Sequence, residues 1–214
     1  MKMKFLSVAL GVALSATVMN ASAQKAYTQG LITFKTSMRG QDVEIKNYFT
    51  ADSSASTFNA GPATIKLLTD AKHDYFAVVV DVPVASIKKA AISTPAEIEE
   101  AMSALPKLTF APGTETKQIS GFNCKKVVAT DTKTSKTYEI WVTNDVTLPT
   151  TAFPDYYSAI GGVPIQYTAF QSGQTTDITV SSITDDKAPA GTFSISKDYD
   201  KITMDDLKAM GGGR

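Results

Sequence analysis

The chain has 214 residues, of which 43% are hydrophobic, and its 21 Lys and Arg side chains are balanced by 21 Asp and Glu side chains. A neutral chain without clustered positive charge is unsuited to nucleic acid or to an anionic membrane surface, so we expect neither as a partner. The length is typical of one domain with a sizeable core. A single Cys cannot form an internal disulfide, so the stability of the fold must come from packing.

The first 23 residues have the pattern of a cleaved signal peptide. Lys2 and Lys4 precede an apolar run over residues 5–18, and Ala21-Ser22-Ala23 is an A-x-A cleavage site. A transmembrane anchor is the alternative, but the run is shorter than the roughly 20 residues that span a bilayer. We therefore expect an exported protein that is periplasmic, in the cell envelope or secreted, that begins at Gln24 and that does not itself span the membrane.

The segment 27–82 predicts a series of β-strands. Residues 27–38 and 42–50 alternate apolar and polar side chains and predict a hairpin around the turn Arg39-Gly40-Gln41. Shorter strands are expected over residues 55–59, 64–69 and 74–82. The last of these contains YFAVVVDV, which is apolar on both faces and indicates that something covers each face of the sheet there.

Residues 84–107 break the β pattern and predict a helix. Thr94 fits the N-cap, Pro95 the first helical position and Glu97 the third, which together are typical of a helix start. The apolar side chains that recur at helical spacing are Ile98, Ala101, Met102 and Leu105. This amphipathic helix is available to cover a face of the sheet.

A short strand over residues 108–110 and a turn at Pro112-Gly113 are expected after this helix. Residues 117–144 then predict a central hairpin that contains the only Cys, Cys124, and the only Trp, Trp141. Both of its strands carry apolar residues on both faces, which a flat sheet with one wet face does not need. The pattern is typical of a strongly curved sheet wrapped around a helix or a ligand. Because Cys124 lies inside an alternating strand, we expect a small buried hydrophobic residue rather than a reactive thiol.

The C-terminal third predicts further strands and a last helix. A connection over residues 148–162, with a short helix at 155–160, leads to a hairpin of 163–171 and 176–183, and a short strand is expected over 192–196. Thr203 caps a predicted terminal helix, and residues 211–214 form a tail that we expect to be disordered. The whole is a mainly β protein with about ten strands and two or three helices in one domain over residues 24–210.

Catalytic and metal-binding patterns are weak in this sequence. The only His, His73, stands beside Asp74 at a predicted turn, where an exposed or capping role is commoner than that of a catalytic base. A pairing of His73 with Cys124 has no further support, and one His and one Cys cannot supply a zinc site. The acidic pairs lack the spacing of a calcium loop. We expect no catalytic residues, no metal and no cofactor, and hence a protein that is not an enzyme.

Two stretches of the central hairpin resemble a known family. ISGFNCKK at residues 119–126, followed by YEIWVTND at 138–145, is similar to the I-x-G-[YF]-x-C-x-K and W-[VY]-[TS] core of exported bacterial proteins of unknown function that are related to the GLPGLI group and have a LolA-like, lipoprotein-carrier-like fold. IGGVPI at 160–165 stands where that group has Gly-Leu-Pro-Gly-Leu-Ile, and this order is lost here. The broader family therefore fits better than the narrower group.

The resemblance implies an antiparallel sheet curved into a half-barrel, with helices over its open concave side. In the carriers of this fold the cavity holds lipoprotein acyl chains. No motif of this chain matches the site residues of those carriers, so the resemblance assigns no functional residue.

Two functional hypotheses follow. The first is a non-enzymatic cell-envelope protein that binds a lipid or a lipidated protein in the half-barrel cavity, and the candidate lining residues are Phe34, Met102, Phe122, Trp141 and Tyr167. Each of these side chains fits an ordinary core position equally well. The alternative is an interaction protein whose core is filled by its own side chains and which docks on an outer-membrane partner through strand edges or loops.

Overall fold

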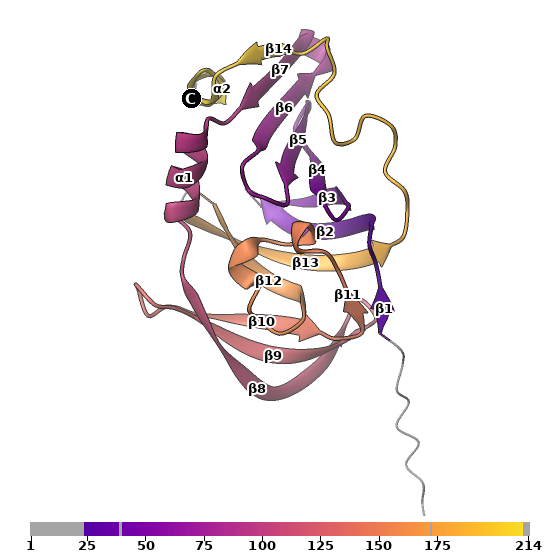
Figure 1. Ribbon diagram of the computed structural model, residues 1–214, viewed down its shortest axis with the longest axis vertical. Helices are drawn as coiled ribbons and strands as arrows, with labels where there is room; N and C mark the ends of the chain where they lie inside the picture. The colour runs from indigo at the N-terminus through magenta and orange to yellow at the C-terminus, as the bar shows by residue number, and fades with distance from the viewer. Residues whose placement is uncertain (1–23, 39, 172, 212–214) are drawn as a thin grey trace, which may run out of the picture.

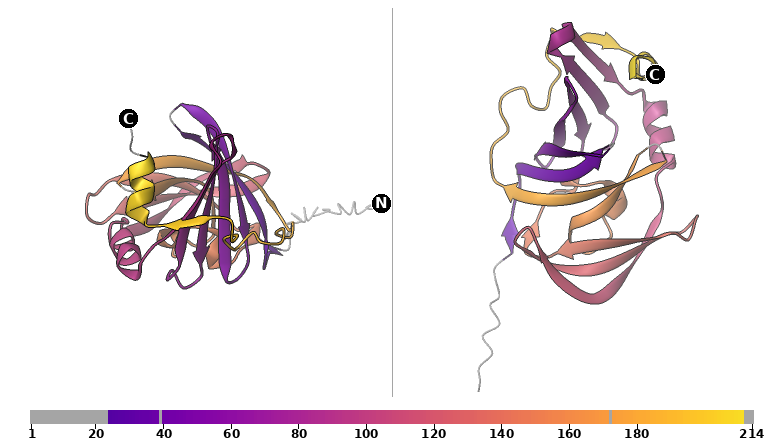
Figure 2. Two further views of the ribbon diagram at one scale, coloured as in Figure 1. Left: turned by 90° about the horizontal axis from the view of Figure 1, so that it is seen from above. Right: turned by 180° about the vertical axis from the view of Figure 1, so that it is seen from behind.

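A computed structural model of the chain describes residues 24–38, 40–171 and 173–211. The predicted signal peptide, residues 1–23, lies outside the described residues, as do residues 212–214 of the predicted tail, whereas Gly211 is the last residue of a helix. Figures 1 and 2 show one strongly curved sheet with few helices. The prediction of a mainly β fold with an open, mostly antiparallel sheet is confirmed.

Six consecutive strands form the first half of the sheet. They are β2 (Gly30–Met38), β3 (Gln41–Phe49), β4 (Ser53–Ala60), β5 (Ala63–Asp70), β6 (Phe76–Val82) and β7 (Ile87–Ile92). Each strand pairs antiparallel with the next. Alternation fixes the register, since Ile32 and Phe34 are buried while Lys35 is exposed. The predicted first hairpin corresponds to β2 and β3.

Five strands form the second half. They are β8 (Leu108–Ile119), β9 (Phe122–Asp131), β10 (Thr137–Thr143), β12 (Val163–Gln171) and β13 (Gln174–Thr184), again paired antiparallel. The β9–β10 pair is the predicted central hairpin, and β12–β13 is the predicted C-terminal hairpin.

The two halves join where β2 pairs with β13. The strand order in the sheet is therefore β14-β7-β6-β5-β4-β3-β2-β13-β12-β10-β9-β8, with β14 (Asp200–Ile202) parallel to β7 at one edge. β1 (Lys25–Ala26) and β11 (Val146–Thr147) form a separate parallel pair. Figure 1 shows the large sheet curving from β14 at the top to β8 at the bottom without closing.

Three parts of the β pattern differ from the prediction. β7 lies in the stretch predicted to break the pattern, because its buried residues are the small Ala90 and Ala91 and it has no alternation of large apolar side chains. The predicted turn at Pro112-Gly113 is a bulge inside β8, where the pairing with β9 shifts between Pro112 and Thr116. The predicted strand over residues 192–196 consists mainly of turns, and the last strand is the three-residue β14 instead.

Both predicted helices begin as expected. α1 (Pro95–Ser103) has a capping box in which Thr94 Oγ1 accepts from the Glu97 amide at 3.3 Å and the Glu97 carboxylate accepts from the Thr94 amide at 2.7 Å. α2 (Met204–Gly211) is capped in the same way by Thr203. Three short 3-10 helices are η1 (Pro83–Ala85), η2 (Thr150–Ala152) and η3 (Asp155–Tyr157). The last of these lies within the short helix predicted at 155–160.

α1 links β7 to β8 along the open side of the sheet (Figure 1) and buries none of its residues. The apolar packing of the fold lies elsewhere, in two clusters. The larger cluster contains the fully buried Ile32, Ile140, Ile165 and Val180 of the central strands. The smaller cluster lies on one face of β4 to β7.

Candidate functional site

One face of the curved sheet contacts the connection between β11 and β12, and we call it the inner face. Asn47 on β3 identifies it, because its side-chain amide donates to the carbonyl oxygen of Ala152 at 3.4 Å. Residues opposite each other in register share a face, so Ser56, which pairs with Asn47, also lies on the inner face. The opposite side of the sheet is the outer face.

The inner face of the second half of the sheet is filled by the protein's own aromatic side chains. Phe153 packs edge-on against Phe34, with ring centroids 6.0 Å apart, and against Tyr167, with centroids 6.1 Å apart. Tyr157 contacts Tyr167 at 5.4 Å and Tyr156 at 4.8 Å. We call Phe153, Tyr156 and Tyr157 the aromatic plug.

Hydrogen bonds and burial hold the plug in place. The Tyr157 hydroxyl donates to the carbonyl oxygen of Thr168 at 2.7 Å, and the Phe170 amide donates to the Tyr156 hydroxyl at 3.1 Å. Burial raises the pKa of Tyr156 to about 12 and also raises the pKa values of Tyr157 and Tyr167. These hydroxyls therefore stay neutral at physiological pH, and the plug is a packing device rather than a source of an acid or base.

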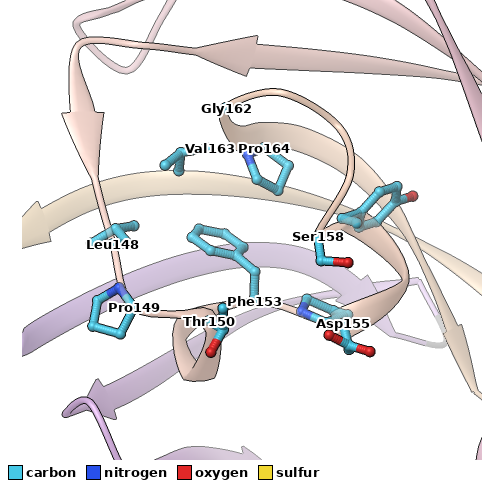
Figure 3. Close-up of a pocket in the computed structure, with 11 residues that line it drawn as sticks. Leu148, Pro149, Thr150, Phe153, Asp155, Ser158, Gly162, Val163 and Pro164 are labelled. Atoms are coloured by element: carbon cyan, nitrogen blue, oxygen red, sulfur yellow. The ribbon is translucent and has the colours of Figure 1, made fainter. Parts of the chain in front are cut away.

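A small hollow remains beside the plug (Figure 3). Its volume is about 120 Å³, and Leu148, Phe153, Asp155 and Pro164 are among the residues that line it. A space of this size holds a few water molecules and no acyl chain. His73 Nε2 lies 3.9 Å from the Asp155 carboxylate, too far for a hydrogen bond.

Of the five predicted cavity residues, Phe34 and Tyr167 are brought together, since both contact Phe153. Met102, on α1, is 39% exposed. Phe122 is half-buried at the turn end of β9, where it pairs with Ile119.

Trp141 points away from the inner face. It pairs with Gln166, the neighbour of Tyr167, so its side chain lies on the outer face. There the ammonium of Lys117 lies 4.0 Å from the centre of the indole ring, and the indole N–H donates to the Glu139 carboxylate at 2.8 Å. Trp141 is buried by these neighbours and lies outside the space that the plug fills.

The inner face of β4 to β7 is different, because its large apolar side chains remain half-buried. Leu67 pairs with Ser56 and with Val78, and Ile65 pairs with Phe58 and with Val80, so all of these lie on the inner face. None of the large apolar side chains on the inner face of β4 to β7 belongs to either hydrophobic cluster. The half-buried apolar residues of the inner face from β4 to β7 are Phe58, Ile65, Leu67, Phe76, Val78, Val80, Val82 and Ile87.

The middle of the outer face of the same strands is covered. Leu68 and Val79 are buried there beneath Phe193, Ile195 and Tyr199, which belong to the segment that leads from β13 to β14. The ammonium of Lys66 fixes this segment by donating to the carbonyl oxygens of Thr192 at 3.4 Å and Ser194 at 2.8 Å. The expectation that something covers both faces of β6 therefore holds fully for the outer face only.

Sequence reasoning identified β6 as apolar on both faces but did not select Leu67, Val78 or Val80 as candidate ligand contacts. The signal was the run FAVVVDV itself, in which Val78 and Val80 alternate with the buried Ala77 and Val79. That Leu67 lies beside Val78 follows only from the register between β5 and β6, which the sequence does not show.

The described residues contain no group of three or more His, Cys, Asp or Glu side chains that could hold a metal ion. In the same part of the chain, neither helix has the length and apolar character needed to cross a bilayer. Most side chains on the inner face of β4 to β7 are hydrocarbon. Ser54, Ser56 and Thr69 add hydroxyl groups, and Lys89, held by Asp200 at 2.8 Å, is the charged exception. Such a surface can bind apolar groups by excluding water from them.

Comparison with known proteins shows the fold alone. No protein-family model matches the chain, and no curated protein matches it. A structure of PNGF-II is similar with a TM-score of 0.50 and 19% identity over 86% of this chain, which spans only 33% of that protein. An uncharacterized conserved protein from Thermus thermophilus is similar with a TM-score of 0.50 and 10% identity, covering 85% of this chain and 92% of that one.

Proposed function

We propose that this protein is an exported, non-enzymatic cell-envelope protein that binds an acyl-type apolar ligand, carried by a lipid or a lipidated protein, on the inner face of β4 to β7. The observation that carries the proposal is the row of eight half-buried apolar side chains on that face. They belong to neither hydrophobic cluster, although Leu68 and Val79 on the outer face of the same strands are buried in one.

Energetics favour a partner for this face. Soluble monomers rarely expose large contiguous apolar patches unless the patches bind something. Burying a Leu, Val, Ile or Phe side chain fully stabilises by about 1.5–3 kcal/mol relative to full exposure, so covering eight half-exposed ones contributes several kcal/mol to binding.

α1 is suited to act as a lid over such a ligand. Its apolar side chains Ile98 and Met102 are not buried, and the helix runs along the open side of the sheet (Figure 1). Met102 has an unbranched, polarisable side chain that adapts to an irregular apolar surface. The similarity to lipoprotein-carrier-like proteins in the central hairpin is consistent with this role.

A second candidate function is that of an interaction protein that docks on an outer-membrane partner. The aromatic plug favours it, because Phe153 and Tyr157 already fill the inner face of the second half of the sheet. The twelve-residue β8 also pairs on one side only, at the edge of the sheet. However, the bulge at Pro112 weakens this edge as a template for strand addition.

The test compares binding of a fatty acid to the inner face of the wild type and of Leu67→Asp, measured from the NMR signals of the Ile65 and Ile87 methyl groups on that face. A carboxylate in the middle of the inner face should weaken binding at least about tenfold, because the ligand would have to desolvate it. Val84→Asp is the matched control: Val84 is 83% exposed in η1 after β6, and the same change there should leave the affinity unaltered.

Circular dichroism and thermal unfolding must show that both variants are folded. Unchanged affinity in a folded Leu67→Asp protein would rule out the inner face as the site. A wild-type protein that binds no fatty acid would favour the interaction role instead.

A further inference from the structure

A second hollow lies on the outer face, on the other side of the sheet from the proposed acyl site. It has a volume of about 490 Å³ and is bounded by the ends of β6 and β7 and by the segment 193–201. We call it the outer groove. Its volume is within the range of small-molecule sites, roughly 300–1,000 Å³.

The floor and one wall of the outer groove are apolar. Ile92 pairs with Ala77, so it lies on the outer face, and it is 39% exposed although large apolar residues on that face are otherwise covered. Phe193 and Ile195 pack partly against the smaller hydrophobic cluster and also line the groove. An apolar chain lying here would bury the free side of all three.

The rim of the groove is positively charged. Lys197 and Lys201 line it and are exposed, and neither forms an ion pair with the other described residues. The adjacent acidic groups are already matched, since Lys88 pairs with Asp198 at 2.6 Å and Lys89 with Asp200 at 2.8 Å.

Lys66 and Asp81 also lie near the groove, and with them the ammonium groups still outnumber the carboxylates. Lys66 donates to the carbonyl oxygens of Thr192 and Ser194, so it brings positive charge without a carboxylate partner. Asp81 accepts from the Tyr199 hydroxyl at 3.0 Å and lies 4.0 Å from the Lys88 ammonium, which it shares with Asp198. Around the segment 193–201, five ammonium groups therefore face three carboxylates, those of Asp81, Asp198 and Asp200. Asp70 and Asp74 lie beside Tyr75, away from Lys197 and Lys201 in the chain.

We propose that the outer groove is a binding site for a small anionic amphiphile with one alkyl chain, such as a long-chain carboxylate. The alkyl chain lies against Ile92, Phe193 and Ile195, and the carboxylate pairs with Lys197 and Lys201. The groove is separate from the inner face, since neighbouring residues of one strand point to opposite faces. The proposal does not depend on the function proposed for the inner face.

The experiment uses dodecanoate below its micellar concentration as the probe and follows isoleucine methyl groups by NMR. Ile92 and Ile195 report on the outer groove, and Ile65 and Ile87 report on the inner face. We expect saturable shifts of the Ile92 and Ile195 methyl signals. Leu67→Asp should leave these shifts unchanged while it removes any shifts at Ile65 and Ile87.

The positive rim is tested with the double variant Lys197→Ala and Lys201→Ala. It should weaken dodecanoate binding at Ile92 about fivefold or more and should leave the binding of neutral dodecanol unaltered. Lys133→Ala and Lys136→Ala, at exposed positions in the β9–β10 turn, make the same charge change away from the groove and should have no effect.

The proposal is overturned if dodecanoate shifts neither Ile92 nor Ile195. It is also overturned if the rim variant binds dodecanoate as tightly as the wild type does. Shifts confined to Ile65 and Ile87 would refute the outer groove and support the inner face, so the two sites succeed or fail separately.

Discussion

The hydroxyl of Tyr156 shows how a partly buried polar group serves packing in this protein. It accepts the Phe170 amide at 3.1 Å, and the ring packs edge-on against Phe170 with centroids 5.3 Å apart. Burial raises its pKa to about 12, above the value of about 10 for an exposed tyrosine. The folded state therefore holds this proton more tightly than the unfolded state does.

This difference predicts a loss of stability in alkali. The contribution of Tyr156 is fully present below pH 10 and is lost as the pH rises from about 10 to about 12, because the unfolded state releases its proton first. We expect the fall in the free energy of unfolding between pH 8 and pH 11 to be up to about 1 kcal/mol smaller in Tyr156→Phe than in the wild type. Urea unfolding at the two pH values measures it, and equal falls in both proteins would contradict the assignment.

The burial of Cys124 can be predicted from its place in an alternating strand. Cys124 was expected to be a small buried hydrophobic residue, and it is 1% exposed. Burial raises the pKa of its thiol to about 11, which disfavours the reactive thiolate. Alternation within β9 is sufficient to predict this, since it requires only local sequence.

Among the elements, α1 is formed by its local sequence rather than by packing. Its capping box is complete, and Pro95 occupies the first helical position, but no residue of the helix is buried. A helix of nine residues is too short to be stable by itself in water, so its cap contributes a large part of its local stability.

We therefore predict that Thr94→Ala acts locally. Loss of the cap costs about 1 kcal/mol and should speed hydrogen exchange of the amides in residues 95–103. Global unfolding should change little, because no core residue lies in α1. Thr203→Ala at α2 is a useful comparison, because α2 contains the buried Met204. We expect this substitution to lower the global stability more than Thr94→Ala does. A large drop in the global stability of Thr94→Ala would show that α1 packs more tightly than this structure indicates.

The elements that sequence reasoning predicted well carry a local signal. β2, β3 and the β9–β10 hairpin alternate clearly, and the caps at Thr94 and Thr203 mark both helix starts. β7 and β14 carry none, because β7 buries alanines and β14 is short and depends on its parallel pairing with β7. Their formation is decided by tertiary contacts, which propensity cannot foresee.

The candidate site was predictable only in part for the same reason. Phe34 and Tyr167 were recognised as apolar inner residues, but only the fold shows that Phe153 fills the space between them. Trp141 was an attractive ligand contact by residue type, and the β10–β12 register turns it to the outer face. A shift of one residue in register exchanges the two faces, so a site on a sheet requires the pairing as well as the pattern.

For the molecule as a whole, the proposed location and ligand can be examined together. We expect cells that export the full chain to yield, from the envelope fraction, a protein whose mass corresponds to a start at Gln24. Organic extraction and mass spectrometry of that protein should give a lipid in stoichiometric amount. An uncleaved chain in the cytoplasm would contradict export, and a cleaved chain without lipid would favour the interaction role.

The pairing of β2 with β13 has a consequence for the order in which the sheet assembles. The hydroxyl of Ser181 donates to the carbonyl oxygen of Thr33 across this seam, between residues that are 148 positions apart in the chain. During synthesis the meander from β2 to β7 is complete long before β13 exists, so one long edge of β2 waits unpaired. Such an edge accepts any strand that reaches it first, including β2 of a second nascent chain. The middle of the finished sheet therefore closes only after almost all of the other strands have been made, and it is a position at which a slow or crowded chain is exposed to pairing with the wrong partner.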